Sequence, residues 1–226
     1  MRKALLTPVF AFLVVTALVA QQPAAPPQGG QQGLTEAMIK TAAIEVPRLV
    51  ELLELKPGMT IADVGAGFGA WTTAFSKWIG PNGRVYSTDI GEKQLAFLRE
   101  TAKKEGLTNV TVLAGAERST NLPAGCCDAI LIRDAYHHLT QPSDVLRSIA
   151  ASLKPGGRLA VIDFPPRPNS EIPAGVPANR MGHGVPPDVV IQEVKAAGLT
   201  MVTQNLQWSA QSQPSDLFLV VFRKAS

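Results

Sequence analysis

An acidic residue and three alternating glycines follow an apolar run in the stretch Ile61-Ala62-Asp63-Val64-Gly65-Ala66-Gly67-Phe68-Gly69. This order predicts a buried strand, a tight turn and a helix that begins at Ala70. Glycines allow the sharp bend and let a ligand approach the main chain closely. The helix start adds free N–H groups and a partial positive charge. We therefore expect the turn to bind a nucleoside-containing ligand. The expected contacts are Gly65, Ala66, Gly67 and Gly69.

Two ligands fit this turn. The spacing Gly65-x-Gly67-x-x-Ala70 matches the dinucleotide fingerprint, in which a pyrophosphate rests on the helix start. That interpretation leaves a nicotinamide-dependent oxidoreductase open. However, Asp63 stands two residues before the first glycine, where its carboxylate would repel a pyrophosphate and attract an ammonium group. The acid therefore favours a nucleoside ligand that carries an amino group.

A second acid supports nucleoside binding. The stretch Arg84–Thr88 is expected to be a strand, and Asp89 follows it about 20 residues after the glycine turn. An acid at such a strand end can accept hydrogen bonds from ribose hydroxyls. Ile90 comes next and belongs to the same expected binding surface. Asp89 does not discriminate between the two ligands, because both contain ribose.

Histidines supply the residues that could do acid–base chemistry. The fourth expected strand runs into Asp134-Ala135-Tyr136-His137-His138. Histidine titrates near neutral pH and suits a general base. We expect His138 to be the base, because it lies deeper in the following turn, with His137 as the other candidate. Tyr136 is a further candidate site residue, which could stack on a substrate or pack in the core. His183 lies on a proline-rich stretch, 164–187, that is expected to be a functional loop or lid. A metal site from the three histidines would need the fold to unite two distant segments, and we predict no metal.

Strands and helices alternate along the chain, which predicts a parallel sheet with helices on both faces. The ligand then belongs at the carboxyl ends of the strands. The last two strands have a connection that is too short for a crossover helix, which favours an antiparallel pair. Before the sheet, Pro47 interrupts a helical pattern and predicts two helices or a kink. The expected strands are Thr60–Val64, Arg84–Thr88, Val110–Ala114, Ala129–Arg133, Arg158–Phe164, Leu199–Leu206 and Leu217–Phe222. The expected helices are Thr35–Leu55, Ala70–Ile79, Glu92–Glu105, Ser143–Leu153 and Asp188–Ala197.

From about residue 52 to residue 224 the chain resembles the class I S-adenosylmethionine (SAM) methyltransferases. The resemblance is carried by Asp63-x-Gly65-x-Gly67-x-Gly69, by the Asp89 strand end, by Leu122-Pro123 before Asp128, and by Leu153-Lys154-Pro155-Gly156-Gly157 before the fifth strand. It implies a Rossmann-like sheet of seven strands with an antiparallel last strand, and SAM as cofactor.

The resemblance also implies roles for single residues. Asp63 would take the methionine ammonium and Asp89 the ribose. The residues just after the fourth strand, Asp134 among them, would face the methyl group. Many relatives have Gly-Asp-Ala after the third strand, where this chain has Gly115-Ala116-Glu117. Glu117 is therefore the expected contact to the adenine amino group, shifted by one residue.

The chain begins like a secretory signal peptide. Arg2 and Lys3 precede an apolar run, and cleavage is expected near Ala20. Residues 21–33 contain no charge and no large apolar side chain, which predicts a disordered linker. The folded domain is expected over residues 34–226, in a periplasmic or secreted protein with no stable membrane span after processing.

Charge and cysteine content exclude several classes. The net charge of +3 includes Arg2 and Lys3, and no basic stripe stands out, so nucleic-acid binding has no support. The only cysteines, Cys126 and Cys127, are adjacent. Because a bond between neighbours strains the backbone, we expect them to stay unpaired.

These observations predict a SAM-dependent methyltransferase that acts on a small-molecule acceptor. The alternative is an exported, non-catalytic module that binds SAM or another nucleoside, because SAM is made in the cytoplasm and export would separate enzyme from donor.

Overall fold

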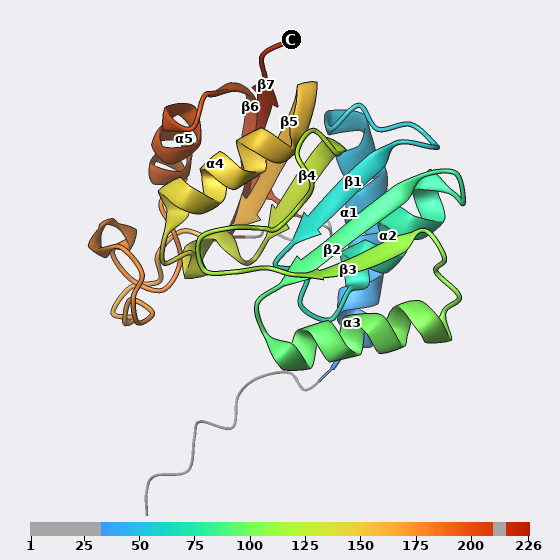
Figure 1. Ribbon diagram of the computed structural model, residues 1–226. Coiled ribbons are helices and arrows are strands. Elements are labelled where there is room, and N and C mark those ends of the chain that lie inside the picture. The colour runs from blue at the N-terminus through green and yellow to red at the C-terminus, as the bar shows by residue number, and fades with distance from the viewer. Residues whose placement is uncertain (1–32, 210–215) are drawn as a thin grey trace, which may run out of the picture. The chain divides into compact units, whose positions relative to one another are not determined.

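The structure, a computed structural model, describes residues 33–209 and 216–226. Over this range the chain forms one seven-stranded sheet with the order β3-β2-β1-β4-β5-β7-β6 (Figure 1). Neighbouring strands from β3 to β5 are parallel, and β7 is antiparallel to both β5 and β6. The predicted fold class, including the antiparallel last strand, is confirmed. The strands are β1 (Thr60–Val64), β2 (Arg84–Asp89), β3 (Val110–Ala114), β4 (Cys127–Arg133), β5 (Leu153–Asp163), β6 (Leu199–Trp208) and β7 (Leu217–Lys224).

Helices cover both faces of this sheet (Figure 1). α1 and α2 bury apolar side chains against one face, and α4 and α5 do the same on the other. β4 and β5 carry alternate side chains into both apolar layers, which is the pattern of a sheet buried on both sides. The helices are α1 (Glu36–Leu52), α2 (Ala70–Ile79), α3 (Glu92–Lys104), α4 (Pro142–Ser152) and α5 (Pro187–Ala196), with short 3₁₀ turns η1 (Tyr136–His138) and η2 (Ala178–Arg180).

The helix before the sheet differs from one expectation. Pro47 lies inside a single helix, α1, and does not divide it into two. Proline removes one backbone hydrogen bond. Val46, Leu49 and Val50 are buried on either side of it. Their packing against the sheet keeps the helix continuous, because tertiary burial contributes more to helix stability than one backbone bond.

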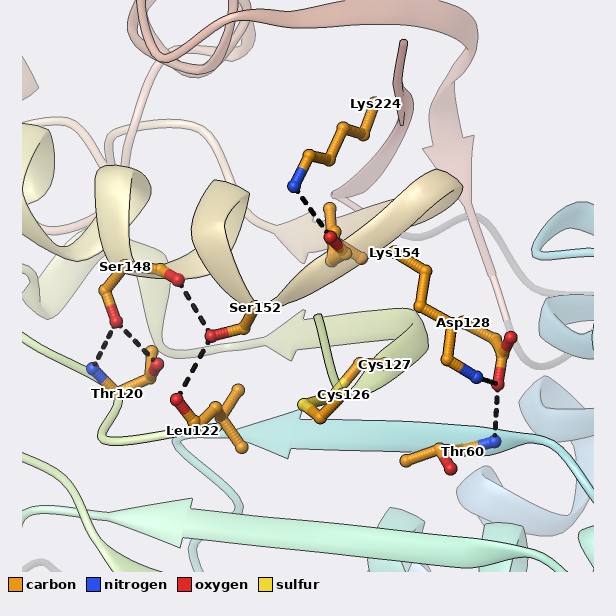
Figure 2. Close-up of a disulfide and its surroundings, with 11 residues drawn as sticks. Thr60, Thr120, Leu122, Cys126, Cys127, Asp128, Ser148, Ser152, Lys154 and Lys224 are labelled. Atoms are coloured by element: carbon orange, nitrogen blue, oxygen red, sulfur yellow. Dashed lines mark hydrogen bonds and ion pairs between the residues drawn. A yellow bond between two sulfur atoms is a disulfide. The ribbon is translucent and has the colours of Figure 1, made fainter. Parts of the chain in front are cut away.

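Two sequence features near β4 and β5 were interpreted wrongly. β5 begins at Leu153, not at Arg158, because Leu153 already pairs with Cys127. Cys126 and Cys127 form a disulfide, although adjacent cysteines were expected to stay unpaired. Figure 2 shows this bond at the amino end of β4, beside the ion pair of Asp128 with Lys154. The disulfide therefore lies at the edge of the sheet opposite to the carboxyl ends.

The predicted signal peptide and all but the last residue of the predicted linker fall outside the described residues, so both stay predictions. Among the residues that the structure describes, no helix is long and apolar enough to cross a membrane.

Candidate functional site

The glycine turn connects the carboxyl end of β1 to α2, as expected. Gly65, Gly67 and Gly69 all have positive φ angles, of 70°, 54° and 80°. A Cβ on Gly65 would lie 2.5 Å from Cβ of Ala135, so this glycine lets the turn sit against the segment after β4. A Cβ on Gly67 would meet nothing within 4 Å. The turn therefore packs closely on one side and leaves open space at Gly67, where a ligand can approach the main chain.

The turn does not offer a cradle for phosphate. The N–H groups of Gly65 and Ala66 both donate to the carbonyl oxygen of Thr88, at 2.8 and 3.0 Å. The N–H of Gly67 donates to Oδ2 of Asp89 at 2.9 Å, and that of Gly69 to the carbonyl oxygen of Ala66. A pyrophosphate site needs such N–H groups to point at the ligand. This geometry disfavours the dinucleotide interpretation.

Asp63 lies beneath the turn. Its side chain is 3% exposed, and its Oδ2 accepts a hydrogen bond of 2.7 Å from the Thr72 hydroxyl. Burial raises the pKa of Asp63 to about 6, and the hydrogen bonds from Thr72 only partly offset this. The carboxylate is thus a buried negative charge at the base of the loop. Its expected contact with an ammonium group stays a prediction.

Asp89 and Ile90 match a nucleoside. Each Asp89 carboxylate oxygen accepts one backbone N–H, from Gly67 and from Gly91, both at 2.9 Å. A carboxylate has about four lone-pair sites, so acceptor capacity remains for ribose hydroxyls. Ile90 is 71% exposed, an unusual setting for a large apolar side chain and a suitable surface for a base. The open space at Gly67, the Asp89 carboxylate and the Ile90 side chain therefore fit the nucleoside part of SAM.

The other expected cofactor contacts, Glu117 and Asp134, follow the carboxyl ends of β3 and β4. Glu117 is exposed and accepts a hydrogen bond of 2.9 Å from the Thr140 hydroxyl. Asp134 follows β4 with a φ of 54°, a strained value for a non-glycine residue. Burial and the nearby Asp163 carboxylate raise the pKa of Asp134. Asp134 thus stands at the carboxyl end of β4, where the sequence placed it.

The histidines come together near the carboxyl end of β4. His137 is 2% exposed, and its Nδ1 lies 2.8 Å from Oδ1 of Asp163. His138 is exposed, and its ring centroid lies 4.0 Å from that of His137. His183, from the loop of residues 164–187, lies 4.9 Å from His137 and 5.7 Å from His138 by ring centroids. We call these three residues the histidine cluster.

The carboxylate partner belongs to His137, whereas the sequence favoured His138 as base. The His138 ring is partly covered by its neighbours although the residue is exposed, and this partial burial, followed by His137 and His183, lowers its pKa to about 4. His138 is therefore neutral at pH 7, yet it is a weaker base than an ordinary histidine. Burial, followed by His137 and then Arg167, lowers the pKa of His183.

Tyr136 has a structural partner. Its hydroxyl donates a hydrogen bond of 2.7 Å to Oε2 of Glu193 on α5, and its side chain is fully buried. Arg180 from η2 donates to both oxygens of the same glutamate, at 2.9 and 3.0 Å. These contacts tie η1, η2 and α5 together. Stacking of Tyr136 on a substrate, which the sequence left open, has no support from this buried position.

Sequence reasoning missed four charged residues of this region: Glu45, Asp163, Arg180 and Glu193. Asp163 could have been predicted from the sequence, because it ends a strand next to the one that precedes the histidines. The sequence contains no comparable indication for Glu45. Its buried carboxylate accepts hydrogen bonds from Trp71, Trp208 and Arg133, which come from three distant parts of the chain.

Comparison with known proteins identifies the fold and the ligand together. Residues 61–157 match the model of a methyltransferase domain. A SAM-dependent methyltransferase from Aquifex aeolicus superposes with a TM-score of 0.66 at 26% identity, over 84% of this chain and 93% of that one. Residues 61–157 are thus a methyltransferase domain, and the folded chain around them has the fold of the class I SAM-dependent methyltransferases. The cofactor of this family is SAM, in agreement with the glycine turn and Asp89.

Other relatives show how far this conclusion extends. The ubiquinone/menaquinone biosynthesis C-methyltransferase UbiE of Bordetella parapertussis is 34% identical over 110 residues, which is 49% of this chain and 42% of that protein. The chain thus matches less than half the length of these curated relatives. The [4+2]-cyclase SpnF shares the fold, with a TM-score of 0.63 and 16% identity over 80% of each chain. The fold therefore hosts more than one chemistry.

Proposed function

We propose that this protein transfers a methyl group from SAM to a small-molecule acceptor. One observation carries the proposal: the glycine turn with Asp89 and the histidine cluster lie at the same edge of the sheet, because β1, β2 and β4 are parallel and end there. Bound SAM supplies a methyl group on a positively charged sulfur. This chain would bind the nucleoside through Asp89 and Ile90 and hold an acceptor near the segment after β4.

Alignment of acceptor and donor can supply much of the rate. An in-line displacement needs the attacking atom near the methyl carbon, and well-oriented reactants reach effective molarities of about 10⁵–10⁸ M. A base is needed only where the acceptor must lose a proton. For that step the cluster offers two candidates, His138, which is exposed, and His137, which Asp163 orients.

We do not assign the acceptor of the relatives to this chain. The family match ends at residue 157, before the loop that carries His183. That loop brings His183 beside the two histidines that follow β4, so we expect its side chains to take part in selecting the acceptor. The name of the UbiE relatives nevertheless makes phenols and quinols the first compounds to test, followed by catechols and small amines.

A second candidate function is the binding of SAM or a related nucleoside without turnover. The cyclase neighbour has this fold, so the fold alone does not require methyl transfer. Arg2, Lys3 and the apolar run after them support the further proposal that the protein is exported, with processing near Ala20. An exported protein would be separated from cytoplasmic SAM. A module that binds SAM or a related nucleoside without turnover is the resulting alternative.

Calorimetric titration of the purified protein with SAM, S-adenosylhomocysteine and NAD tests the cofactor. We expect both sulfur nucleosides to bind and NAD not to bind. Asp89→Ala should weaken SAM binding by about 10- to 150-fold, since charge-assisted hydrogen bonds of about 1.5–3 kcal/mol are lost. The matched control is Glu92→Ala, an acid in the first turn of α3 just beyond the proposed contacts.

Methyl transfer itself needs an acceptor panel and detection of methylated product. Product formation with any member supports the enzyme, and tight SAM binding with no product from the whole panel favours the binding module. N-terminal sequencing of the protein from its native host tests export. A soluble cytoplasmic protein that still begins at Met1 would overturn that part of the proposal.

A further inference from the structure

All three histidines of the chain meet in the histidine cluster. Two belong to η1 and the third comes from a loop 45 residues later in the sequence, so the fold brings them together. Their ligand nitrogens all lie within 4.8 Å of one another. Imidazole is a preferred ligand of zinc, copper, iron and nickel ions.

The ring nitrogens of the cluster have few other partners. Nδ1 of His137 is held by Asp163, which leaves Nε2 as its available nitrogen. Within residues 33–209 and 216–226, the ring nitrogens of His138 and His183 have no hydrogen-bond partner. The ring of Phe164 lies 4.6 Å from that of His137 and 5.5 Å from that of His183. The nitrogens thus face one another beside an apolar ring, an arrangement that a shared cation would stabilise.

The loop around His183 is built to hold that residue in place. Gly182 and Gly184 flank it with φ angles of 140° and 127°. A Cβ on Gly184 would lie 2.6 Å from the carbonyl oxygen of Pro165. The N–H of His183 donates to the Ser170 hydroxyl at 2.7 Å, and its carbonyl accepts from the N–H of Arg167 at 3.0 Å. The backbone on both sides of His183 is therefore fixed.

Carboxylates supply the charge balance that a dication needs. Asp163 contacts His137 directly, and a ligand atom of Asp134 lies within 4.8 Å of both. The opposing charges are Arg133 and Arg167, which both act on Asp134, and the Arg167 guanidinium lies over the Phe164 ring at 4.5 Å from the centroid. A carboxylate that accepts the second N–H of a ligating histidine is the usual outer partner in zinc sites. Asp163 has that position toward His137.

We propose that His137, His138 and His183 bind one divalent transition-metal ion, with zinc as the best fit. Zinc–nitrogen bonds are about 2.0–2.1 Å long, which puts the nitrogens of a tetrahedral site about 3.4 Å apart. The ligand nitrogens now lie within 4.8 Å of one another, so metal binding requires the rings of His138 and His183 to move closer to Nε2 of His137. Three protein ligands leave a fourth position for water or an acceptor oxygen, as in catalytic zinc sites. While the metal is bound, the imidazole lone pairs hold it, so His137 and His138 can act as the general base of the proposed reaction only in the zinc-free protein.

The first experiment measures metal binding without reference to methyl transfer. The full-length chain is purified through a histidine-free tag, stripped with a chelator and titrated with zinc chloride in a calorimeter. We expect one zinc ion per chain. Titration with Co²⁺ should produce the visible absorption of a tetrahedral nitrogen site.

Variants decide whether the cluster is responsible. His183→Ala and His138→Ala should each weaken zinc binding by at least about 100-fold, and Asp163→Asn by about 10- to 100-fold. Met181→Ala is the matched control, since Met181 lies on the same loop with 70% of its surface exposed and offers no ligand to the cluster. Circular dichroism verifies that each variant is folded. Absence of saturable zinc binding, or binding that survives both histidine substitutions, would overturn the proposal.

The same samples separate this proposal from the proposed function. SAM is titrated into each protein with and without zinc. Protein that binds SAM but no zinc rejects the metal site alone, whereas protein that binds zinc but no SAM rejects the cofactor assignment alone.

Discussion

Nδ1 of His137 lies 2.8 Å from Oδ1 of Asp163, and both side chains are almost fully buried. Oδ2 of the same carboxylate accepts the backbone N–H of His137, so Asp163 fixes both the ring and the main chain of this residue. A carboxylate in this position orients an imidazole and holds one of its two ring nitrogens, which leaves the other available. The pair therefore couples the end of β5 to the segment that follows β4.

Asp163→Asn tests this coupling. The amide group lacks the charge and cannot accept all the hydrogen bonds that the carboxylate receives. We expect turnover to fall by about 10- to 100-fold while SAM affinity is kept. The control is Asp188→Asn, which changes an exposed carboxylate of α5 and should have no effect. Equal turnover of Asp163→Asn and the parent would show that the carboxylate only supports the fold.

Asp63 should make folding stability depend on pH. Its folded pKa of about 6 exceeds the ordinary 3.8, so the folded state favours the protonated acid. This contribution is present below pH 3.8 and is lost as the pH rises through 6, where ionisation in the buried site costs about 3 kcal/mol. Asp63→Asn should gain stability relative to the parent between pH 4 and pH 7. Urea unfolding at both pH values measures this, and identical pH profiles for the two proteins would contradict it.

The same residue should make SAM binding depend on pH. If the ionised carboxylate attracts the methionine ammonium, SAM affinity should rise as the pH increases through about 6. Asp63→Asn should bind SAM about 10- to 150-fold more weakly at pH 7.5, through the loss of a charge-assisted interaction. Calorimetry at several pH values compares the two proteins. Unchanged affinity in the variant would remove Asp63 from the cofactor site.

His138→Ala tests whether His138 acts as the general base of methyl transfer. In the zinc-free protein its lone pair is free to accept a proton, and as a general base His138 should then contribute about 10²–10⁴-fold to turnover without contributing to SAM affinity. Because its pKa is about 4, the parent should keep its activity down to about pH 5 and lose it as the imidazole is protonated near pH 4. An ordinary histidine would lose activity near pH 6.5. Turnover between pH 4 and pH 8, with circular dichroism as a folding control, measures this. A change below threefold in the zinc-free variant would reject the base.

Arg180 should be the most costly single change in the loop. It is fully buried and donates to both oxygens of Glu193. Arg180→Met leaves the glutamate without its partner, and breaking such a pair costs about 3–5 kcal/mol. Tyr136→Phe removes only one hydrogen bond to the same glutamate and should cost about 0.5–1.5 kcal/mol. Thermal unfolding compares the two, and a similar small cost for both would mean that the ion pair contributes little.

Local patterns were enough to predict much of this fold. β1, α2 and β3 have the predicted bounds. Apolar residues of β1 and α2 are buried as their patterns predict, and β3 is a short apolar run that ends before Gly115. The disulfide and the continuous helix through Pro47 could not be predicted, since each depends on tertiary packing that overrides a local preference. The site divides in the same way. The turn and Asp89 are local signals, whereas the meeting of His183 with His137 requires the path of the whole loop.

The contact of Arg180 with Glu193 also bears on how an acceptor reaches the site. A loop that opens must first take a buried guanidinium away from its carboxylate, and the free-energy cost of that separation makes open conformations rare. An acceptor of the proposed reaction would then be selected by the side chains that the closed loop presents, and not by closure of the loop around a bound compound. Changing the acceptor range of this protein would therefore require new side chains on the loop, since greater mobility alone would first cost the protein its stability.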